Sequence, residues 1–194
     1  MQFNGGRDDG RGHGGRYYLC GRHLCHFSDE IYCMAAIATL AAELGATLKA
    51  RGFMLALAES CTGGMAAQAV TSIAGSSAWF DRAFVTYSNQ AKVDMLGVRN
   101  QTLLQFGAVS EQTAAEMAHG ALKFSLAQIS ASITGIAGPD GGTAEKPVGT
   151  VCLGFALKNS IKTSTQHFAG TRESVRQQAT IYAITQLLEL MRAA

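Results

Sequence analysis

The alternation of two hydrophobic patterns from Met34 onward is the feature that most restricts how this chain can fold. Short apolar runs of strand length are followed by longer segments with apolar residues at helical spacing, as over 35–51. Strands interleaved with helices predict an α/β fold in layers. A hairpin is expected from the runs 148–157 and 161–169, so the sheet should be mixed. We therefore expect a single three-layer α/β/α domain with a mixed, largely parallel sheet.

The other expected elements follow the same two patterns. We expect strands over 54–59, 83–88 and 129–135, and helices over 62–73, 89–96, 100–106, 111–127 and 173–191. Gly52 occupies the position of a helix stop, and Ser110 occupies that of a helix N-cap.

Residues 1–33 differ in composition from the rest of the chain. They contain seven of the 22 glycines, three of the five cysteines and three of the five histidines. Their apolar residues follow neither the helical nor the strand period. Because such a segment buries too little apolar surface to offset its ordering entropy, we expect a poorly ordered extension before a domain over 34–194. Met34 could then be the natural start. The possible zinc ligands of this extension lack the paired spacing of structural sites, so a metal site is the weaker interpretation. They are Cys20, His23, Cys25, His26 and Cys33.

The charge balance excludes a strongly basic nucleic-acid surface. The 16 Lys and Arg residues against 14 Asp and Glu give a net charge of +2, without blocks of like charge. Charged residues make up only 15% of the chain, against roughly 25% in an average soluble domain. This low fraction favours a homo-oligomer.

No segment is expected to cross a membrane or to direct secretion. The longest uncharged stretch, 60–80, is rich in Ser, Thr, Gly and Gln, unlike an apolar span of about 20 residues. The first 16 residues lack the apolar core of a signal peptide. Five cysteines without framework spacing favour a reduced protein of the cytoplasm.

Polar, glycine-rich segments follow three of the expected strands. They occupy 59–64, 86–92 and 134–143. Ligands bind at the carboxyl ends of strands in α/β sheets, so we expect these segments to meet at the functional site. The third segment combines Pro139 with several glycines, and Pro147 lies just beyond it, which indicates a binding loop of defined shape. It matches neither a Walker A nor a dinucleotide-binding motif.

Ser60 lies at the turn between an expected strand and an expected helix. Free N–H groups at that helix N-terminus could hold a phosphate or an oxyanion, and Gly63 and Gly64 would let a ligand approach the backbone. The alternative is that Ser60 or Thr62 only caps the helix.

Lys92 follows another expected strand and has two interpretations. Partly desolvated, a lysine can lose its proton and activate a serine hydroxyl, whereas most lysines are solvated. Tyr87 could donate a hydrogen bond, offer a stacking surface or belong to the core. Because His119 and His167 are isolated, a Ser-His-Asp hydrolase is disfavoured. Cys61 is an alternative nucleophile, although no histidine partner can be placed beside it.

The motifs of these segments resemble the C-terminal domain of the competence/damage-inducible CinA proteins. The matching stretches are ESCTGG (59–64), FVTYSNQAK (84–92), GAVS (107–110) and ITGIAGPDGGTAEKPVGTV (133–151). The resemblance covers about 35–191, and stand-alone versions of this domain are nicotinamide-nucleotide amidohydrolases. It implies hydrolysis of the carboxamide of nicotinamide mononucleotide (NMN) to nicotinate mononucleotide and ammonia, a step of pyridine nucleotide salvage.

Carried onto this chain, the resemblance implies a Ser-Lys mechanism. Ser60 would be the nucleophile, Lys92 its base and Tyr87 an assisting or orienting group. The candidates for binding the substrate phosphate would be Arg172 and the loop 138–142, with Arg176 one helical turn on as the competing match for Arg172. The implied substrate contacts are Thr62, Gly63, Gly64, Thr134, Gly135, Gly138, Gly141, Gly142 and Arg172.

The expected chemistry uses no metal and no cofactor, because a hydroxyl, an amine and backbone N–H groups can together hydrolyse an amide. The resemblance also favours a dimer. Two other hypotheses remain open at this point. One is a non-enzymatic nucleotide-binding module, and the other is an amidase that acts on a different amide.

Overall fold

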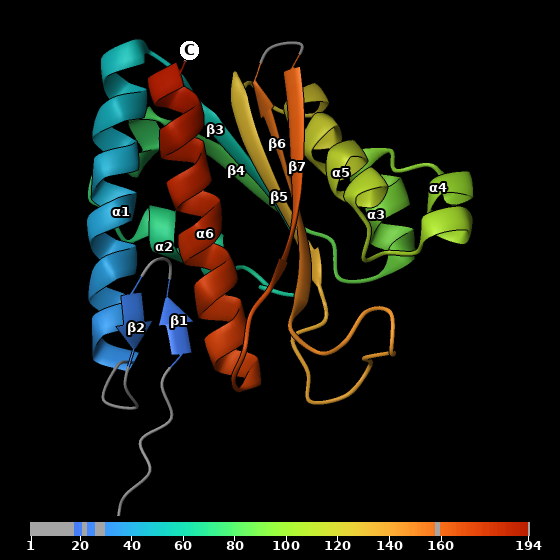
Figure 1. The fold of residues 1–194 in the computed structure, drawn as a ribbon. Coiled ribbons are helices and arrows are strands. Elements are labelled where there is room, and N and C mark those ends of the chain that lie inside the picture. Colours follow the sequence, from blue (N-terminus) through green and yellow to red (C-terminus); the bar gives the residue numbers. More distant parts are fainter. Residues whose placement is uncertain (1–17, 21–22, 26–29, 158–159, 194) are drawn as a thin grey trace, which may run out of the picture.

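A five-stranded sheet with helices on both faces forms the body of the molecule (Figure 1). The computed structural model describes residues 18–20, 23–25, 30–157 and 160–193. Two short strands, β1 (Tyr18–Cys20) and β2 (His23–Cys25), pair separately as an antiparallel ribbon. The other elements are α1 (Glu30–Arg51), β3 (Leu55–Glu59), α2 (Met65–Thr71), η1 (Ser76–Ala78), β4 (Phe80–Val85), α3 (Asn89–Leu96), α4 (Asn100–Phe106), α5 (Glu111–Lys123), β5 (Ile129–Gly135), β6 (Thr150–Leu157), β7 (Ser160–His167) and α6 (Arg172–Ala193).

The sheet is mixed, as the sequence predicts. Its strand order is β4-β3-β5-β6-β7, in which β3 runs parallel to β4 and β5. The pairs β5–β6 and β6–β7 are antiparallel. Because β3, β4 and β5 run in the same direction, their carboxyl ends lie at one edge of the sheet. Glu59 is in register with Val85 on one side and with Ile133 on the other.

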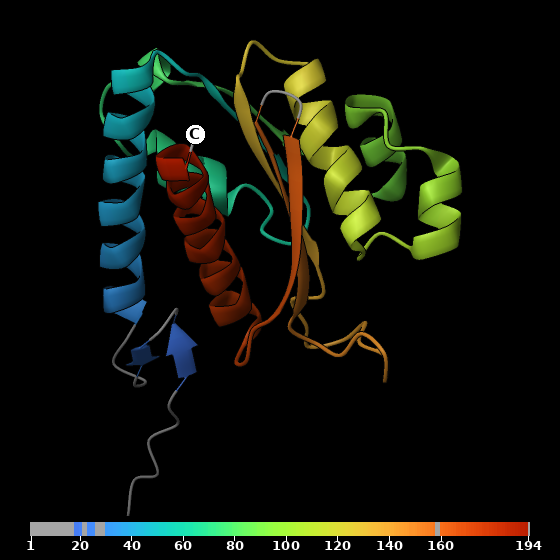
Figure 2. The same ribbon diagram turned by 45° about the horizontal axis from the view of Figure 1, so that its top comes forward.

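The helices form two layers, one on each side of the sheet (Figures 1 and 2). Helices α1, α2 and α6 pack together on one face, and α5 covers the other with α3 and α4 outside it. Alternate residues of β3 serve the two layers, since Leu57 belongs to the core under α1 and α6 and Ala58 to the core under α5. Ser130 and Ser132 of β5 donate hydrogen bonds to carbonyl groups of α5, at 2.7 and 2.6 Å. These bonds and the small side chains bring α5 close to the sheet.

Several element boundaries differ from those expected; α2 covers Met65–Thr71 rather than 62–73, and α5 ends at Lys123 rather than at 127. Helix α1 begins at Glu30, before the compositional break at Met34. Strand β4 covers 80–85 rather than 83–88, because an edge strand tolerates charges and Asp81 pairs with Arg82 at 2.7 Å. The strands β1 and β2 were not expected, since three residues are too few to show a period. Residues 1–17, 21–22 and 26–29 lie outside the described residues, so the extension over 1–33 stays a prediction. The same holds for most of the hairpin turn at 158–160.

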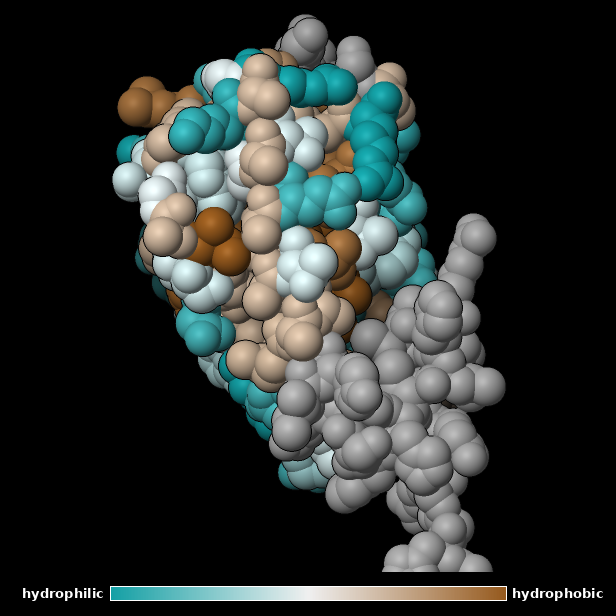
Figure 3. Space-filling view, turned by 90° about the vertical axis from the view of Figure 1, so that its left-hand side faces the viewer, coloured by the Kyte–Doolittle hydropathy of each residue, from teal (hydrophilic) through white to brown (hydrophobic). Residues whose placement is uncertain are grey.

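Helix α1 contains a stretch, Cys33–Arg51, that is long and apolar enough to cross a membrane by length and composition alone. From the sequence, no membrane-crossing segment was expected. Core helices of soluble proteins pass the same test, and the inner face of α1 places Ile37, Leu44 and Leu48 in the main core. Figure 3 shows the outer face, where weakly hydrophobic residues form a column between hydrophilic ones. The stretch is therefore weak evidence for a membrane segment.

Candidate active site

The turn after β3 carries Ser60 to the edge of the sheet where three strands end. The Ser60 N–H still belongs to the sheet, because it donates to the carbonyl of Ile133 at 2.9 Å. The chain then turns sharply into α2. Gly63 and Gly64 have φ angles of 60° and 96°, in the left-handed region that favours glycine. The Gly63 N–H closes the turn on the Ser60 carbonyl at 3.1 Å.

Lys92 approaches Ser60 from the neighbouring strand end. Ser88 caps α3 by accepting from the Ala91 N–H at 3.0 Å, which places Lys92 at the start of the helix. Lys92 is 1% exposed, and its Nζ atom donates to Ser60 Oγ at 3.0 Å and to the Thr86 carbonyl at 2.8 Å. Burial lowers the pKa of Lys92, because desolvation disfavours the charged amine. A neutral amine at this distance can accept the proton of the serine hydroxyl.

Burial has the opposite effect on the pKa of Cys61, the alternative nucleophile. Its side chain is 6% exposed, and burial raises the pKa of the thiol to about 12. The thiolate is the reactive form of cysteine, so this thiol is unreactive near neutral pH. The contact of Lys92 with the Ser60 hydroxyl therefore favours Ser60 as the nucleophile.

The N-terminus of α2 is occupied by a carboxylate of the chain itself. Glu59, the last residue of β3, is fully buried and accepts from the N–H groups of Gly64, Ala66 and Ala67 at 3.0, 3.2 and 2.8 Å. The expectation that the first amides of this helix hold a substrate anion has to be corrected, since these three donors are already used. Gly64 thus serves the turn rather than offering its N–H to the substrate.

Two N–H groups of the turn remain for a developing negative charge. The N–H groups of Cys61 and Thr62, directly after Ser60, donate to no other described residue, although the Cys61 N–H faces its own thiol. The Thr62 hydroxyl is buried and also has no partner among the described residues. The Thr62 carbonyl accepts from Arg176 at 2.8 and 3.2 Å, which fixes the orientation of this peptide. Donors directly after a nucleophile are placed to stabilise an oxyanion.

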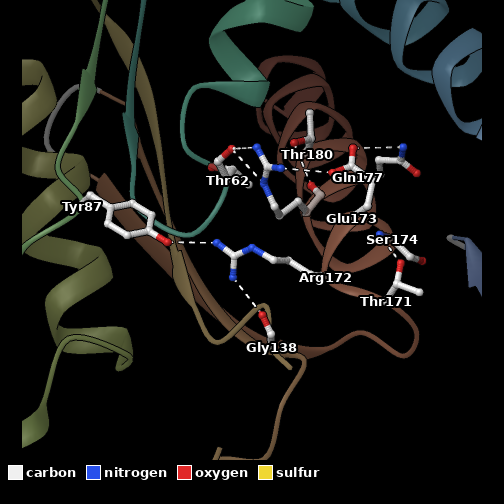
Figure 4. A network of polar contacts seen from close by, with 10 residues as sticks. Thr62, Tyr87, Gly138, Thr171, Arg172, Glu173, Ser174, Gln177 and Thr180 are labelled. Carbon is white, nitrogen blue, oxygen red and sulfur yellow. Dashed lines mark hydrogen bonds and ion pairs between the residues drawn. The ribbon is translucent and has the colours of Figure 1, made fainter. Parts of the chain in front are cut away.

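Arg172 reaches from the start of α6 to Tyr87 and to the loop at Gly138 (Figure 4). One nitrogen donates to the Tyr87 hydroxyl at 2.9 Å, and another donates to the Gly138 carbonyl at 2.9 Å. The Tyr87 side chain is 63% exposed and makes no hydrogen bond with Ser60 or Lys92 in the described structure. Tyr87 therefore lies with the binding groups rather than with the Ser-Lys pair.

The two candidate arginines of α6 differ in their partners. Arg176 forms an ion pair with Glu173 at 3.1 Å and also bonds the Thr62 carbonyl. Arg172 has no carboxylate partner among the described residues. A cation without a carboxylate is the better candidate for a substrate phosphate.

The remaining predicted substrate contacts, Thr134 and three glycines, differ in burial and in position. Thr134 is buried, and its hydroxyl donates to the Ala108 carbonyl at 2.8 Å, which ties the GAVS stretch to the end of β5. The hydroxyl hydrogen is thus used within the protein. Gly135 is the last residue of β5, and Gly141 and Gly142 lie in the exposed part of the loop. The structure gives these three glycines no contact with the Ser-Lys pair.

A pocket of about 390 Å³ lies elsewhere, beside the start of α5. Neither Ser60 nor Lys92 lines it. Its lining residues are Phe106, Val109, Ser110, Glu111, Gln112, Glu145, Lys146, Thr150, Cys152 and Thr165. Within the described residues, no group of three or more His, Cys, Asp or Glu side chains could hold a metal ion.

Sequence reasoning missed two residues that shape the site, Glu59 and Thr86. Both stand inside the motifs that carry the resemblance. An acidic residue directly before the nucleophile was the available signal for Glu59. Thr86 acts through its backbone carbonyl, for which a side-chain pattern gives no signal.

Comparisons with known proteins identify the family of the chain. The family model of the CinA C-terminal domain matches residues 37–191. The nicotinamide-nucleotide amidohydrolase PncC of Enterobacter agglomerans is 58% identical over 146 residues, which cover 75% of this chain and 89% of that protein. PncC of Escherichia coli K12 is 56% identical, with 76% and 90% covered.

Solved structures show the same fold. A competence/damage inducible protein from Agrobacterium tumefaciens superposes with a TM-score of 0.78 at 48% identity, covering 80% of this chain and 95% of that one. A CinA superfamily protein from Klebsiella pneumoniae gives 0.79 at 38% identity, with 81% and 99% covered. The chain therefore belongs to the CinA C-terminal domain family.

Proposed function

We propose that this chain is an amidohydrolase that converts NMN to nicotinate mononucleotide and ammonia. One observation carries the chemistry, namely the buried Lys92 amine, of lowered pKa, 3.0 Å from Ser60 Oγ. The substrate is supported by the relatives named nicotinamide-nucleotide amidohydrolase, which are 56–58% identical to this chain. The Ser-Lys contact favours an enzyme over a module that only binds nucleotides.

The first half of the reaction forms an ester on Ser60. Neutral Lys92 takes the hydroxyl proton while Oγ attacks the carboxamide carbon. The carbonyl oxygen becomes an oxyanion near the N–H groups of Cys61 and Thr62. Protonated Lys92 then gives its proton to the amide nitrogen, the C–N bond breaks and ammonia leaves.

The second half releases the acid. A water molecule attacks the ester carbon while Lys92 accepts one of its protons. The ester bond breaks, and the Ser60 oxygen takes back a proton from Lys92. The product is a pyridine carboxylic acid, which loses its proton to the solvent, and the serine and the neutral amine are restored for the next cycle.

Arg172 is the proposed ligand of the substrate phosphate. Tyr87 and the Gly138 carbonyl hold its guanidinium between two elements of the site. An arginine can bind a phosphate through two parallel hydrogen bonds. The nucleotide is therefore preferred over the corresponding nucleoside amide.

The test is ammonia release from NMN by the purified protein. We expect turnover by the wild type, survival of turnover after EDTA treatment and loss in Lys92→Ala. NMN binding without ammonia release would point to the binding module. Absence of both would show that another amide is the substrate.

A homodimer and a cytoplasmic location belong to the same proposal. The low charge fraction supports self-association, as does the largely exposed apolar stretch of α1. Cys61 and Cys152 form no disulfide, which suits a reducing compartment. Sedimentation velocity on the purified protein should give twice the chain mass of 20.4 kDa.

A further inference from the structure

The Glu59 carboxylate is a buried negative charge without a cation. The side chain is fully buried, and no Lys, Arg or His forms an ion pair with it among the described residues. An ionised carboxylate in such a place is costly unless donors satisfy its oxygen atoms. Here all the donors are backbone N–H groups, those of Gly64, Ala66 and Ala67.

These three bonds enclose the turn that carries the nucleophile. They join residue 59 to residues 64, 66 and 67, so that residues 60–63 form a closed loop between them. Two glycines with positive φ make this turn intrinsically flexible, because glycine has more backbone freedom than any other residue. The carboxylate supplies the restraint that the turn itself lacks.

We propose that Glu59 is a positioning residue, which holds Ser60 Oγ at the distance from the Lys92 amine that the reaction requires. The inference rests on the proposed function. Glu59 does not touch the reacting atoms, and it acts through the turn that it closes.

The backbone of Glu59 holds the base in the same way. Its carbonyl accepts from the Thr86 N–H at 2.7 Å, and the Thr86 carbonyl accepts from Lys92 Nζ at 2.8 Å. One residue is therefore linked to both partners, to Ser60 as its chain neighbour and to Lys92 through Thr86. A shift of Glu59 would change the distance between nucleophile and base.

Arg176 restrains the same turn through a different backbone group. It donates two hydrogen bonds to the Thr62 carbonyl, while Glu59 accepts from N–H groups that follow. Glu59 thus binds N–H groups of this short segment, and Arg176 binds one of its carbonyl groups. This arrangement offers a second, independent substitution that should loosen the turn.

Glu59→Gln is the first variant, because it keeps the size of the side chain. The new amide NH₂ would face a backbone donor, so at least one of the three bonds is lost. We expect kcat to fall by about 10- to 100-fold, with the KM for NMN within about twofold, because misplacement by about 1 Å can cost that much. If Glu59→Gln does not fold, Arg176→Met is the second variant, and it should likewise lower kcat and leave the KM for NMN nearly unchanged.

Glu116→Gln is the matched control. Glu116 also accepts a backbone N–H, that of Arg99 at 2.8 Å, and it lies on α5 away from Ser60. We expect it to lower the melting temperature and to leave kcat unchanged. Equal loss of kcat in Glu59→Gln and Glu116→Gln would overturn the proposal, and so would an unchanged kcat in Glu59→Gln.

Amide hydrogen exchange gives a readout that needs no substrate. In Glu59→Gln, the amides of Gly64, Ala66 and Ala67 should exchange faster than in the wild type, while those of α5 keep their rates. Unchanged exchange would overturn the proposal. Wild-type protein that releases no ammonia would instead refute the proposed function, and the exchange experiment would still test the restraint.

Discussion

At the residue scale, burial acts in opposite directions on two neighbouring side chains. It lowers the pKa of Lys92, which moves the amine toward the neutral form that can act as a base. It raises the pKa of Cys61 to about 12, which keeps the thiol protonated. The same loss of water therefore prepares one group for catalysis and makes the other inert.

Replacing each candidate nucleophile separately tests this difference. Ser60→Ala should lower kcat by at least about 1,000-fold, because it removes the atom that forms the ester. Cys61→Ala should keep kcat within about threefold of the wild type. Initial rates of ammonia release at saturating NMN measure both, and loss of turnover in Cys61→Ala alone would assign the chemistry to the thiol.

The pH dependence of turnover follows from the lowered pKa of Lys92. Only the neutral amine can accept the Ser60 proton, so kcat/KM should rise with pH and level off above this pKa. Because burial lowers the pKa, the midpoint should lie below the ordinary lysine value of 10.5. Rates in overlapping buffers at constant ionic strength give the midpoint, and a profile that falls over the same range would contradict the assignment.

Arg172 and Arg176 can be separated by their kinetic effects. Arg172→Gln should raise the KM for NMN by about 10- to 100-fold, as expected for the loss of charge-assisted hydrogen bonds to a phosphate. It should have little effect on hydrolysis of nicotinamide riboside, which has no phosphate. An equal loss for both substrates would show that Arg172 does not bind the phosphate.

The sequence predicted that Ser60 and Lys92 meet, but it did not predict the residues that hold them in place. The motifs placed Ser60 and Lys92 at neighbouring strand ends, and the structure brings them into contact. The role of Glu59 depends on three backbone groups beyond a turn, which no residue pattern reveals. Arg172 and Arg176 lie one helical turn apart, and their partners in the folded chain distinguish them, since Arg176 pairs with Glu173 and bonds the Thr62 carbonyl.

At the element scale, the position of Lys92 depends on how α3 packs on α5. A Cβ atom on Gly120 of α5 would lie 2.1 Å from the carbonyl oxygen of Leu96, at the end of α3. Glycine at this point lets the two helices approach closely. The base is therefore placed by a helix contact as well as by its own hydrogen bonds.

Gly120→Ala tests this contact. Alanine in the middle of a helix is normally more stable than glycine by about 0.5–1 kcal/mol. Here overpacking should reverse the sign and cost about 1–3 kcal/mol. We expect lower stability in urea and also a lower kcat, because α3 must move.

Gly45→Ala is the control for crowding alone. Its Cβ would lie 2.5 Å from the Trp79 ring, on the opposite layer of the molecule. It should lower stability and keep kcat at temperatures where the protein stays folded. A loss of kcat in both variants would show that the fall in kcat does not come from a movement of α3.

Element boundaries were predicted best where one pattern decides them. The expected ranges 89–96, 100–106 and 129–135 agree with the structure. Strand β4 begins earlier than expected because its first residues include the charged pair Asp81 and Arg82, which only an edge position tolerates. An edge position is a property of the assembled sheet and is not visible in a local pattern.

At the scale of the whole molecule, the sheet explains why distant motifs meet. Three parallel strands end at one edge, which joins the segments around Ser60, Thr86 and Thr134. This convergence could be predicted from the alternation of strands and helices. The strand order could not, because it depends on which connections cross the sheet.

The buried lysine also predicts how the stability of the molecule depends on pH. A lysine whose pKa is lower in the folded state binds fewer protons there than in the unfolded chain. The charged form therefore destabilises the fold below the lowered pKa. This destabilisation disappears as pH rises from that value to about 10.5.

Lys92→Met removes this titration. The free energy of unfolding of the variant relative to the wild type should be greatest at neutral pH and should decrease as pH rises toward 10.5. Urea unfolding across this range measures the difference. Ser60→Ala keeps the lysine, so its difference from the wild type should not vary with pH. A difference between Lys92→Met and the wild type that is constant with pH would show that Lys92 titrates alike in the folded and unfolded chain, and burial would then not explain its role as a base.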